Sequence, residues 1–181
     1  QEQGIKLTYL PFIMKACIEA LKEFPLMNAS LDEENEDIIV KKYYNIGFAV
    51  DVDGEGLVVP VVKYADRKSI LDIAKELQEL SEKSRQRKLD LNDMRGGTFS
   101  ITNYGSIGGM FATPIINYPE SAILGIGRIY DKPLVVEGEV ETRKTLPLSL
   151  VFDHRIADGA YATRFLNTVI SHLQNPEKLL S

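Results

Sequence analysis

The sequence of 181 residues has little of what disulfides and metal sites require. It contains one cysteine, Cys17, and two histidines, His154 and His172. A single cysteine cannot form an intrachain disulfide, and neither residue type is present in the number that a zinc or iron–sulfur site needs. We therefore expect no disulfide and no bound metal.

The chain also lacks an excess of positive charge and a long apolar run. Its 21 Lys and Arg against 26 Asp and Glu give a formal net charge of −5, which argues against electrostatic capture of nucleic acid or of an anionic membrane. No apolar stretch approaches the roughly 18 residues that a membrane-spanning helix requires, and the first residues do not resemble a signal peptide. These absences predict a soluble intracellular protein that binds neither nucleic acid nor membrane.

Hydrophobic periodicity predicts helices at the beginning, in the middle and at the end of the chain. Apolar residues recur at helical spacing over 8–24, 69–88 and 158–173. Thr8 and Ser69 are the expected N-caps of the first two helices, and Pro25 ends the first one. Cys17 lies on the apolar stripe of the first helix, so we interpret it as a small buried side chain rather than a nucleophile.

Strand-like runs lie between the expected helices. They cover 38–44, 46–52, 57–62, 98–103, 121–125 and 146–152. Pro60 predicts an irregularity or a sheet edge in the third run, because proline cannot donate to a strand ladder. Since the sequence has no repeat and no linker, the order of elements predicts one α+β domain over residues 1–181, with helices flanking a mixed β-sheet.

The two histidines differ in their surroundings. His172 has polar neighbours late in the last expected helix and is predicted to lie on the surface. His154 stands where a buried strand ends and a helix begins, a position from which a rigid element projects a side chain into a cleft. Histidine can take and give a proton near neutral pH. Asp158 follows four residues later, where it could cap the helix, pair with a cation or hold local geometry, and the pair alone fits a structural role as well as a catalytic one.

The residues around His154 favour the catalytic interpretation. His-x-x-x-Asp-Gly at a strand-to-helix junction is the signature of a superfamily of CoA-dependent acyltransferases, and residues 152–160, FDHRIADGA, resemble the catalytic domain of the dihydrolipoyl acyltransferases. Further segments resemble the same family in order along the chain, at 45–51, 56–62, 65–70, 97–109, 113–117 and 122–128. This ordered series is far more specific than the short motif alone.

The resemblance implies a chloramphenicol-acetyltransferase-like fold that forms homotrimers, which assemble into a larger hollow core. It implies transfer of an acyl group between a dihydrolipoyl-lysine arm and CoA within a 2-oxo acid dehydrogenase complex. CoA is then a substrate, a lipoyl domain outside this sequence supplies the lipoyl group, and the decarboxylase and dihydrolipoyl dehydrogenase are further partners. The resemblance also implies a location in the cytoplasm, or in the mitochondrial matrix of a eukaryote. Because the chain enters the family pattern partway, we expect it to lack the N-terminal part of the catalytic domain and the lipoyl and peripheral-subunit-binding domains.

The resemblance also assigns roles to single residues. His154 is the base that takes the thiol proton, and Asp158 orients the histidine loop. Thr102 takes the place of the hydroxyl that donates to the oxyanion, where many relatives have serine, and in the trimer it faces His154 of a neighbour. Alternation along the strand places Ser100 on the same face as Thr102, so Ser100 is the reserve donor. Gly159 is expected to allow a close backbone approach or an unusual φ that a Cβ would block, and the loop glycines could similarly admit the narrow pantetheine arm. The candidate substrate-binding residues are Ser100, Gly105, Gly108, Gly109 and Gly159.

Several alternatives stay open at this point. A non-catalytic subunit that only builds the core, or a small-molecule O-acetyltransferase of the same superfamily, would share the fold. The loop 105–109 resembles acetyl and branched-chain transferases more than succinyl transferases, and the sequence does not choose between the first two. At the C-terminus, Leu179 and Leu180 could form a hydrophobic knob for assembly or cap the domain's own core.

Overall fold

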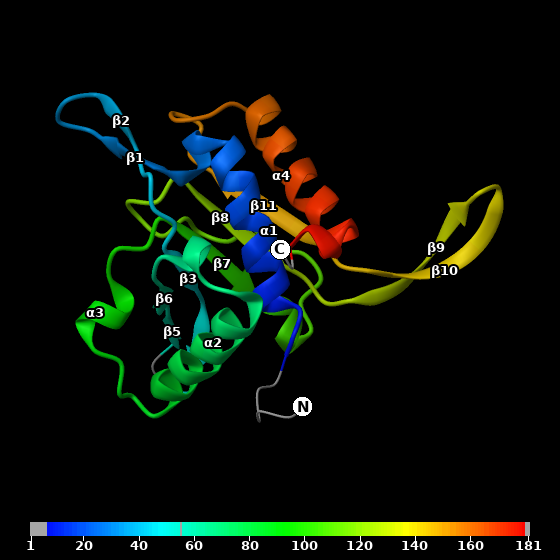
Figure 1. The fold of residues 1–181 in the computed structure, drawn as a ribbon, viewed down its shortest axis with the longest axis horizontal. Coiled ribbons are helices and arrows are strands. Elements are labelled where there is room, and N and C mark those ends of the chain that lie inside the picture. Colours follow the sequence, from blue (N-terminus) through cyan, green and yellow to red (C-terminus); the bar gives the residue numbers. More distant parts are fainter. Residues whose placement is uncertain (1–6, 55, 180–181) are drawn as a thin grey trace.

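The main β-sheet is mixed, as the sequence predicts. The computed structural model describes residues 7–54 and 56–179 (Figure 1). Five strands follow the order β11-β8-β7-β3-β6, with β3 (Ile46–Phe48), β6 (Val61–Val62), β7 (Phe99–Asn103), β8 (Ala122–Ile126) and β11 (Leu148–Phe152). β3, β7 and β8 run parallel, whereas β6 and β11 are antiparallel to their neighbours.

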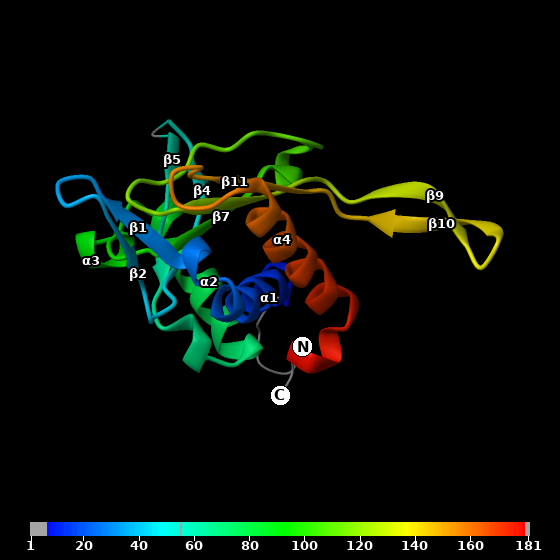
Figure 2. The ribbon, with the colours of Figure 1, turned by 90° about the horizontal axis from the view of Figure 1, so that it is seen from above.

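Three long helices lie on one side of this sheet, as Figure 2 shows. They are α1 (Leu10–Glu23), α2 (Ile70–Arg85) and α4 (Gly159–Gln174). Phe99 and Ile101 of β7 are buried on the helical side, and the Phe99 ring lies 5.8 Å from that of Phe165 in α4. Because side chains alternate along a strand, Ser100 and Thr102 point to the opposite face of the sheet. This arrangement confirms the predicted alternation along β7.

The remaining elements are small. Two-stranded ladders join β1 (Ala29–Asp32) with β2 (Asp37–Val40), β4 (Val50–Val52) with β5 (Gly56–Val58), and β9 (Tyr130–Val136) with β10 (Glu139–Thr145). The short helices are α3 (Leu91–Met94) and the 3₁₀ segments η1 (Pro25–Asn28), η2 (Ala65–Arg67), η3 (Tyr104–Ile107) and η4 (Pro176–Leu179). The β9–β10 hairpin projects from the body of the molecule (Figures 1 and 2). Its strands are largely exposed, and β10 is mostly polar, so they gave no pattern from which to predict the hairpin.

Local signals at the element ends are partly confirmed. Ser69 caps α2 in a capping box, accepting a hydrogen bond from the Asp72 backbone N–H at 3.1 Å. Thr8, in contrast, is not the cap of α1: Tyr9 occupies the N-cap position without a side-chain hydrogen bond. Pro60 falls between β5 and β6 and interrupts the predicted run, as expected for a residue that cannot donate to a ladder.

Three side chains on or near α1 settle sequence-based expectations. Cys17 is fully buried, and burial raises the pKa of its thiol, so it is the predicted packing residue. His172 is not a surface residue, because its ring is half-buried with Nε2 4.0 Å from Glu23 Oε1. Leu179 is 4% exposed and belongs to the hydrophobic core, so it caps the domain; Leu180 lies outside the described residues. Within the described part of the chain, no helix combines the length and apolar character needed to cross a membrane.

Candidate active site

His154 lies in the turn that joins β11 to α4. Its side chain is exposed, and its ring centroid is 5.7 Å from that of Phe152. Ile156 and Ala157, at the end of the turn, are buried and anchor the turn on the core. The imidazole is therefore presented to solvent from an anchored segment, and no aliphatic side chain of residues 7–54 or 56–179 covers it.

The residues directly before and after His154, Asp153 and Arg155, form ion pairs that hold the turn in place. Asp153 accepts hydrogen bonds from the Arg155 backbone N–H at 2.9 Å and from Arg155 Nη2 at 2.7 Å. The same guanidinium donates to Glu33 Oε1 at 2.9 Å, between β1 and β2. The Arg155 guanidinium holds the pKa of the Asp153 carboxyl below its ordinary value. A single exposed ion pair contributes little to stability, but these contacts restrict the backbone directly around His154.

Asp158 caps α4. Its Oδ1 accepts a hydrogen bond from the Tyr161 backbone N–H at 2.7 Å, which satisfies one of the free donors at the helix N-terminus. The sequence left three roles open for Asp158: capping the helix, pairing with a cation, or holding local geometry. The described contacts show the first. The spacing of the motif thus places the N-cap of α4 four residues after His154.

Asp158→Ala should lower the free energy of unfolding by about 1 kcal/mol, because the Tyr161 N–H loses its acceptor. Asp158→Asn and Asp158→Ser should keep most of this stability, since both side chains can accept the same bond. Urea unfolding followed by circular dichroism measures the differences. An alanine variant as stable as the asparagine variant would contradict a stabilising cap.

Thr102 lies in the wall of a cavity of ≈ 400 Å³ on the sheet face that points away from the helices. Ser100 and Asn117 contribute two further polar side chains to this wall. Most other lining residues are apolar, among them Val59, Ile115, Ile116 and Ile123. An apolar slot with a few hydrogen-bonding groups is the usual form of a site for a small ligand.

A buried carboxyl that sequence reasoning missed lies next to this wall. Glu120 is 6% exposed, and its Oε1 accepts a hydrogen bond from Asn117 Nδ2 at 3.1 Å. Burial raises the pKa of Glu120 from its ordinary value of 4.5 to about 7, against the opposing effect of Ser100 and Asn117. The available signal was a glutamate two residues before the apolar run 122–126, where an exposed turn residue was the natural assumption.

The stability of the fold should depend on pH through Glu120. Below pH 4.5 the carboxyl is protonated in the folded and the unfolded chain alike. As the pH rises from 4.5 to about 7, Glu120 ionises in the unfolded chain but stays protonated in the folded one. The free energy of unfolding therefore falls, by about 3 kcal/mol once the pH passes the folded-state pKa. Glu120→Gln lacks this titration, and urea unfolding should show its stability relative to the parent rising by that amount between about pH 4 and about pH 8. An unchanged difference would contradict the buried acid.

The candidate glycines make contacts within their own chain. At Gly105 and Gly109 an added Cβ would meet backbone atoms at 2.3 and 3.0 Å, and Gly108 has a φ of 95° after η3. At Gly159 an added Cβ would meet no described atom of this chain within 4 Å, and its φ is not positive, so neither the close approach nor the unusual φ is found within one chain. None of the four is among the described residues that line the Thr102 cavity. A role in admitting the pantetheine arm stays a prediction.

Within one copy of the chain, His154 and Thr102 lie far apart. In the sheet register, Phe152 pairs with Ala122 and Thr102 with Gly125. Thr102 therefore lies two strands across and three residues along from Phe152, which corresponds to about 14 Å. Because the chain leaves β11 at Phe152 in the direction away from Thr102, His154 is no closer. The two side chains cannot contact the same small group within one copy of the chain.

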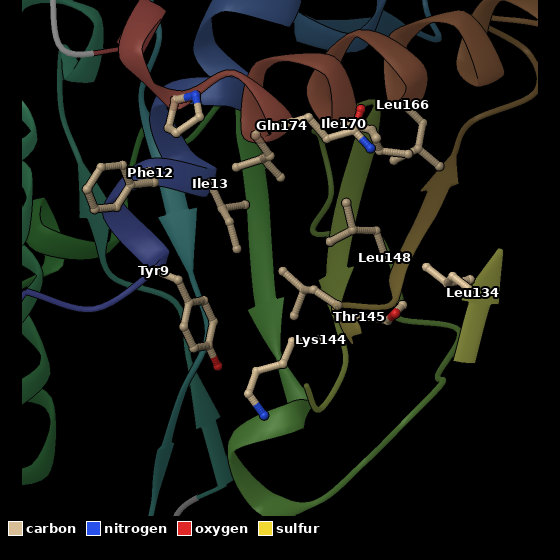
Figure 3. Close-up of a pocket in the computed structure, with 13 residues that line it drawn as sticks. Tyr9, Phe12, Ile13, Leu134, Lys144, Thr145, Leu148, Leu166, Ile170 and Gln174 are labelled. Atoms are coloured by element: carbon tan, nitrogen blue, oxygen red, sulfur yellow. The ribbon is translucent and has the colours of Figure 1, made fainter. Parts of the chain in front are cut away.

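A larger cavity of ≈ 630 Å³ is separate from these residues. It lies between α1, α4, β11 and the base of the β9–β10 hairpin, as the side chains in Figure 3 show. Its lining is largely apolar, with Phe12, Leu148 and Ile170 prominent. Neither His154 nor Thr102 lines it, so it is not part of the candidate site.

Comparisons with known sequences agree with the motifs. The family described as 2-oxoacid dehydrogenases acyltransferase (catalytic domain) matches residues 1–181. The dihydrolipoyllysine-residue acetyltransferase component of pyruvate dehydrogenase complex from Staphylococcus aureus is 52% identical over 179 residues. The match covers 99% of this chain and 41% of that relative, so the chain spans about two fifths of the length of the curated relatives it matches.

Solved structures agree with the fold. The dihydrolipoamide acetyltransferase of Azotobacter vinelandii superposes with a TM-score of 0.94 at 44% identity, covering 99% of this chain and 74% of that chain, and the cubic core of a pyruvate dehydrogenase multienzyme complex gives the same values. Chloramphenicol acetyltransferase, at 14% identity and a TM-score of 0.56 over 96% of this chain and 78% of its own, shares the fold alone. The predicted fold class is therefore confirmed. With a family match over its whole length, the chain belongs to the 2-oxoacid dehydrogenase acyltransferases and corresponds to their catalytic domain.

Proposed function

We propose that the chain transfers an acetyl group between a dihydrolipoyl-lysine arm and CoA in the core of a 2-oxo acid dehydrogenase complex. The observation that carries this proposal is the exposed His154, held on an anchored turn directly before a helix that Asp158 caps. The sequence left acetyl and branched-chain groups open. The name of the Staphylococcus aureus relative, an acetyltransferase component of pyruvate dehydrogenase complex, favours acetyl.

Residue spacing supports the assignment of roles. The Azotobacter vinelandii study concerned the role of a serine, a histidine and an asparagine in the catalytic mechanism, with the histidine 52 residues after the serine and four before the asparagine. The same spacings separate Thr102, His154 and Asp158 here. Two of the residue types differ, but threonine keeps the hydroxyl of serine, and aspartate and asparagine are both good helix caps.

His154 is the general base in this mechanism. A thiol is mostly protonated at neutral pH, and its thiolate is the nucleophile. His154 takes the proton from the CoA thiol, and the sulfur then bonds to the thioester carbonyl carbon of the acetylated lipoyl arm. When the tetrahedral intermediate collapses, the carbon–sulfur bond to the arm breaks and His154 returns the proton to the departing sulfur. No proton or electron is gained or lost overall.

Thr102 stabilises the intermediate. Its hydroxyl donates a hydrogen bond to the oxygen that becomes negative as the tetrahedral carbon forms. In an apolar cavity such a donor contributes more than it would in water, because no solvent competes for the charge. The mostly apolar lining of the Thr102 cavity supports this role.

A complete site then needs two copies of the chain. Because His154 and Thr102 lie on separate parts of one copy, we place His154 of one subunit against Thr102 of the partner subunit in a homotrimer. The exposed apolar side chains of segment 107–118, with Ile115 at 89% exposure, offer a surface for such contacts. The cubic core among the similar structures supports further assembly. The lipoyl domain, the decarboxylase and the dihydrolipoyl dehydrogenase are the proposed partners.

An acyl-transfer assay tests the proposal. The assembled protein, given acetyl-CoA and dihydrolipoamide, should form S-acetyldihydrolipoamide and free CoA, faster than with isobutyryl- or succinyl-CoA. Chloramphenicol as acceptor is the control for a small-molecule O-acetyltransferase. Absence of transfer to dihydrolipoamide would favour the non-catalytic core subunit, and transfer to chloramphenicol alone would favour the other alternative.

A further inference from the structure

Three polar side chains form a cluster at the rear of the Thr102 cavity. Ser100 and Asn117 line the cavity, and Glu120 lies behind them, with its Oε1 accepting the hydrogen bond from Asn117 Nδ2 at 3.1 Å. Ser100 is 2% exposed and Glu120 is 6% exposed. The mechanism above makes no use of Glu120, although an uncompensated buried carboxyl destabilises a fold.

We propose that Glu120 is a positioning residue whose carboxyl sets the direction in which the Ser100 hydroxyl and the Asn117 amide point in the cavity wall. The inference rests on the proposed function, because these two groups flank the place where the thioester carbonyl would sit beside Thr102. Glu120 itself does not line the cavity, so it acts only through its neighbours.

The backbone holds the cluster tightly together. An added Cβ at Gly97 would lie 2.6 Å from Glu120 Oε1, and one at Gly47 would lie 2.8 Å from Ser100 Oγ. Real Cβ atoms do not approach other atoms this closely, so a larger residue at Gly97 or Gly47 would require the Glu120 or the Ser100 side chain to move. Gly47 in β3 and Gly97 just before β7 thus allow the hydroxyl and the carboxyl to be packed where they are.

The protonation state of the carboxyl determines what Ser100 can do. Ser100 lies close enough to favour the charged form of Glu120, although neither Ser100 Oγ nor Glu120 Oε2 has a hydrogen-bond partner of good geometry among the described residues. A protonated Glu120 donates from Oε2 to Ser100 Oγ, which leaves the Ser100 proton free to point into the cavity. An ionised Glu120 accepts that proton and withdraws it from the cavity.

The buried environment supports the protonated form. Burial raises the pKa of Glu120 to about 7, and besides burial only Ser100 and Asn117, both uncharged, shift it. A large share of the carboxyl is therefore neutral at neutral pH. Ser100 then offers a second donor near Thr102.

Two substitutions of similar size separate positioning from packing. Glu120→Gln keeps an acceptor for Asn117 and a donor toward Ser100, so kcat should stay within about twofold of the parent. Glu120→Met fills the space with neither group, and kcat should fall about tenfold while KM for CoA changes little. Ile18→Val, which alters the core within α1 far from the cavity lining, is the control for a general loss of packing and should leave kcat unchanged.

A double-mutant cycle tests whether Glu120 acts through Ser100. Ser100→Ala should lower kcat by a factor similar to that of Glu120→Met. The double variant should have a kcat only slightly below that of either single variant. Additive losses, or a methionine variant with parental kcat, would overturn the proposal. Equal losses in the glutamine and methionine variants would overturn it as well.

Crystal structures of the variants give a readout that does not depend on activity. In the assembled Glu120→Met protein the Ser100 and Asn117 side chains should rotate away from their parental directions, whereas Glu120→Gln should preserve them. Unchanged directions in Glu120→Met would refute the positioning role. A parent protein that transfers no acetyl group, together with the expected rotation, would instead refute the proposed function and leave the positioning role supported.

Discussion

His154→Ala is expected to lower the rate of acetyl transfer by about 100- to 10,000-fold, the usual contribution of a general acid–base group. Without the imidazole, no group in the turn can take the CoA proton: Asp153 and Arg155 are paired with each other, and Asp158 accepts from the helix backbone. The loss should appear in kcat, because the substitution removes a proton acceptor and not a wall of the binding site. Initial rates with acetyl-CoA and dihydrolipoamide measure it.

The fold should tolerate this substitution. His154 is exposed, and its described ring contact is with Phe152 alone, so little packing is lost and the assembly should sediment as the parent does. His172→Ala is the control, because it removes the other histidine, which lies in the last turn of α4 with Nε2 4.0 Å from Glu23 of α1. Parental activity in His154→Ala, or an equal loss in His172→Ala, would contradict the assignment of the base.

The position of His154 was predictable because two strong local signals meet there. An apolar strand and an amphipathic helix enclose the motif on either side, and each signal depends only on residues near in sequence. Strand alternation likewise placed Ser100 and Thr102 on one face of β7. Local periodicity thus determined which elements carry the candidate residues and which way they point.

The rest depends on contacts that sequence spacing does not encode. Glu120 is buried because β7 and the segment before β8 come together, although nothing in its neighbours' polarity indicates burial. Gly159 drew attention as part of a motif, yet the structure leaves open space around it. The β9–β10 hairpin was missed because it has no apolar face against the core. Tertiary contacts override local patterns in each case.

Thr102→Ala is expected to lower kcat by about a hundredfold or more, the usual effect of removing one oxyanion donor. The hydroxyl interacts with the charge that exists only in the transition state, so KM should change far less than kcat. Thr102→Ser is the control, since serine keeps the hydroxyl and loses only a methyl group. Serine and alanine variants with equal activity would contradict a donor role for the hydroxyl.

Mixing the two inactive variants tests the shared site most directly. In trimers co-assembled from equal amounts of His154→Ala and Thr102→Ala chains, a site is intact when its histidine comes from one variant and its threonine from the other. Random assembly makes about a quarter of the sites intact, so the mixture should recover about a quarter of the parental activity although each variant alone is nearly inactive. If both residues acted within one copy, no site would ever be complete, and the mixture would show only the mean of the two residual activities. Recovery therefore depends on the separation of His154 and Thr102 that the sheet register imposes.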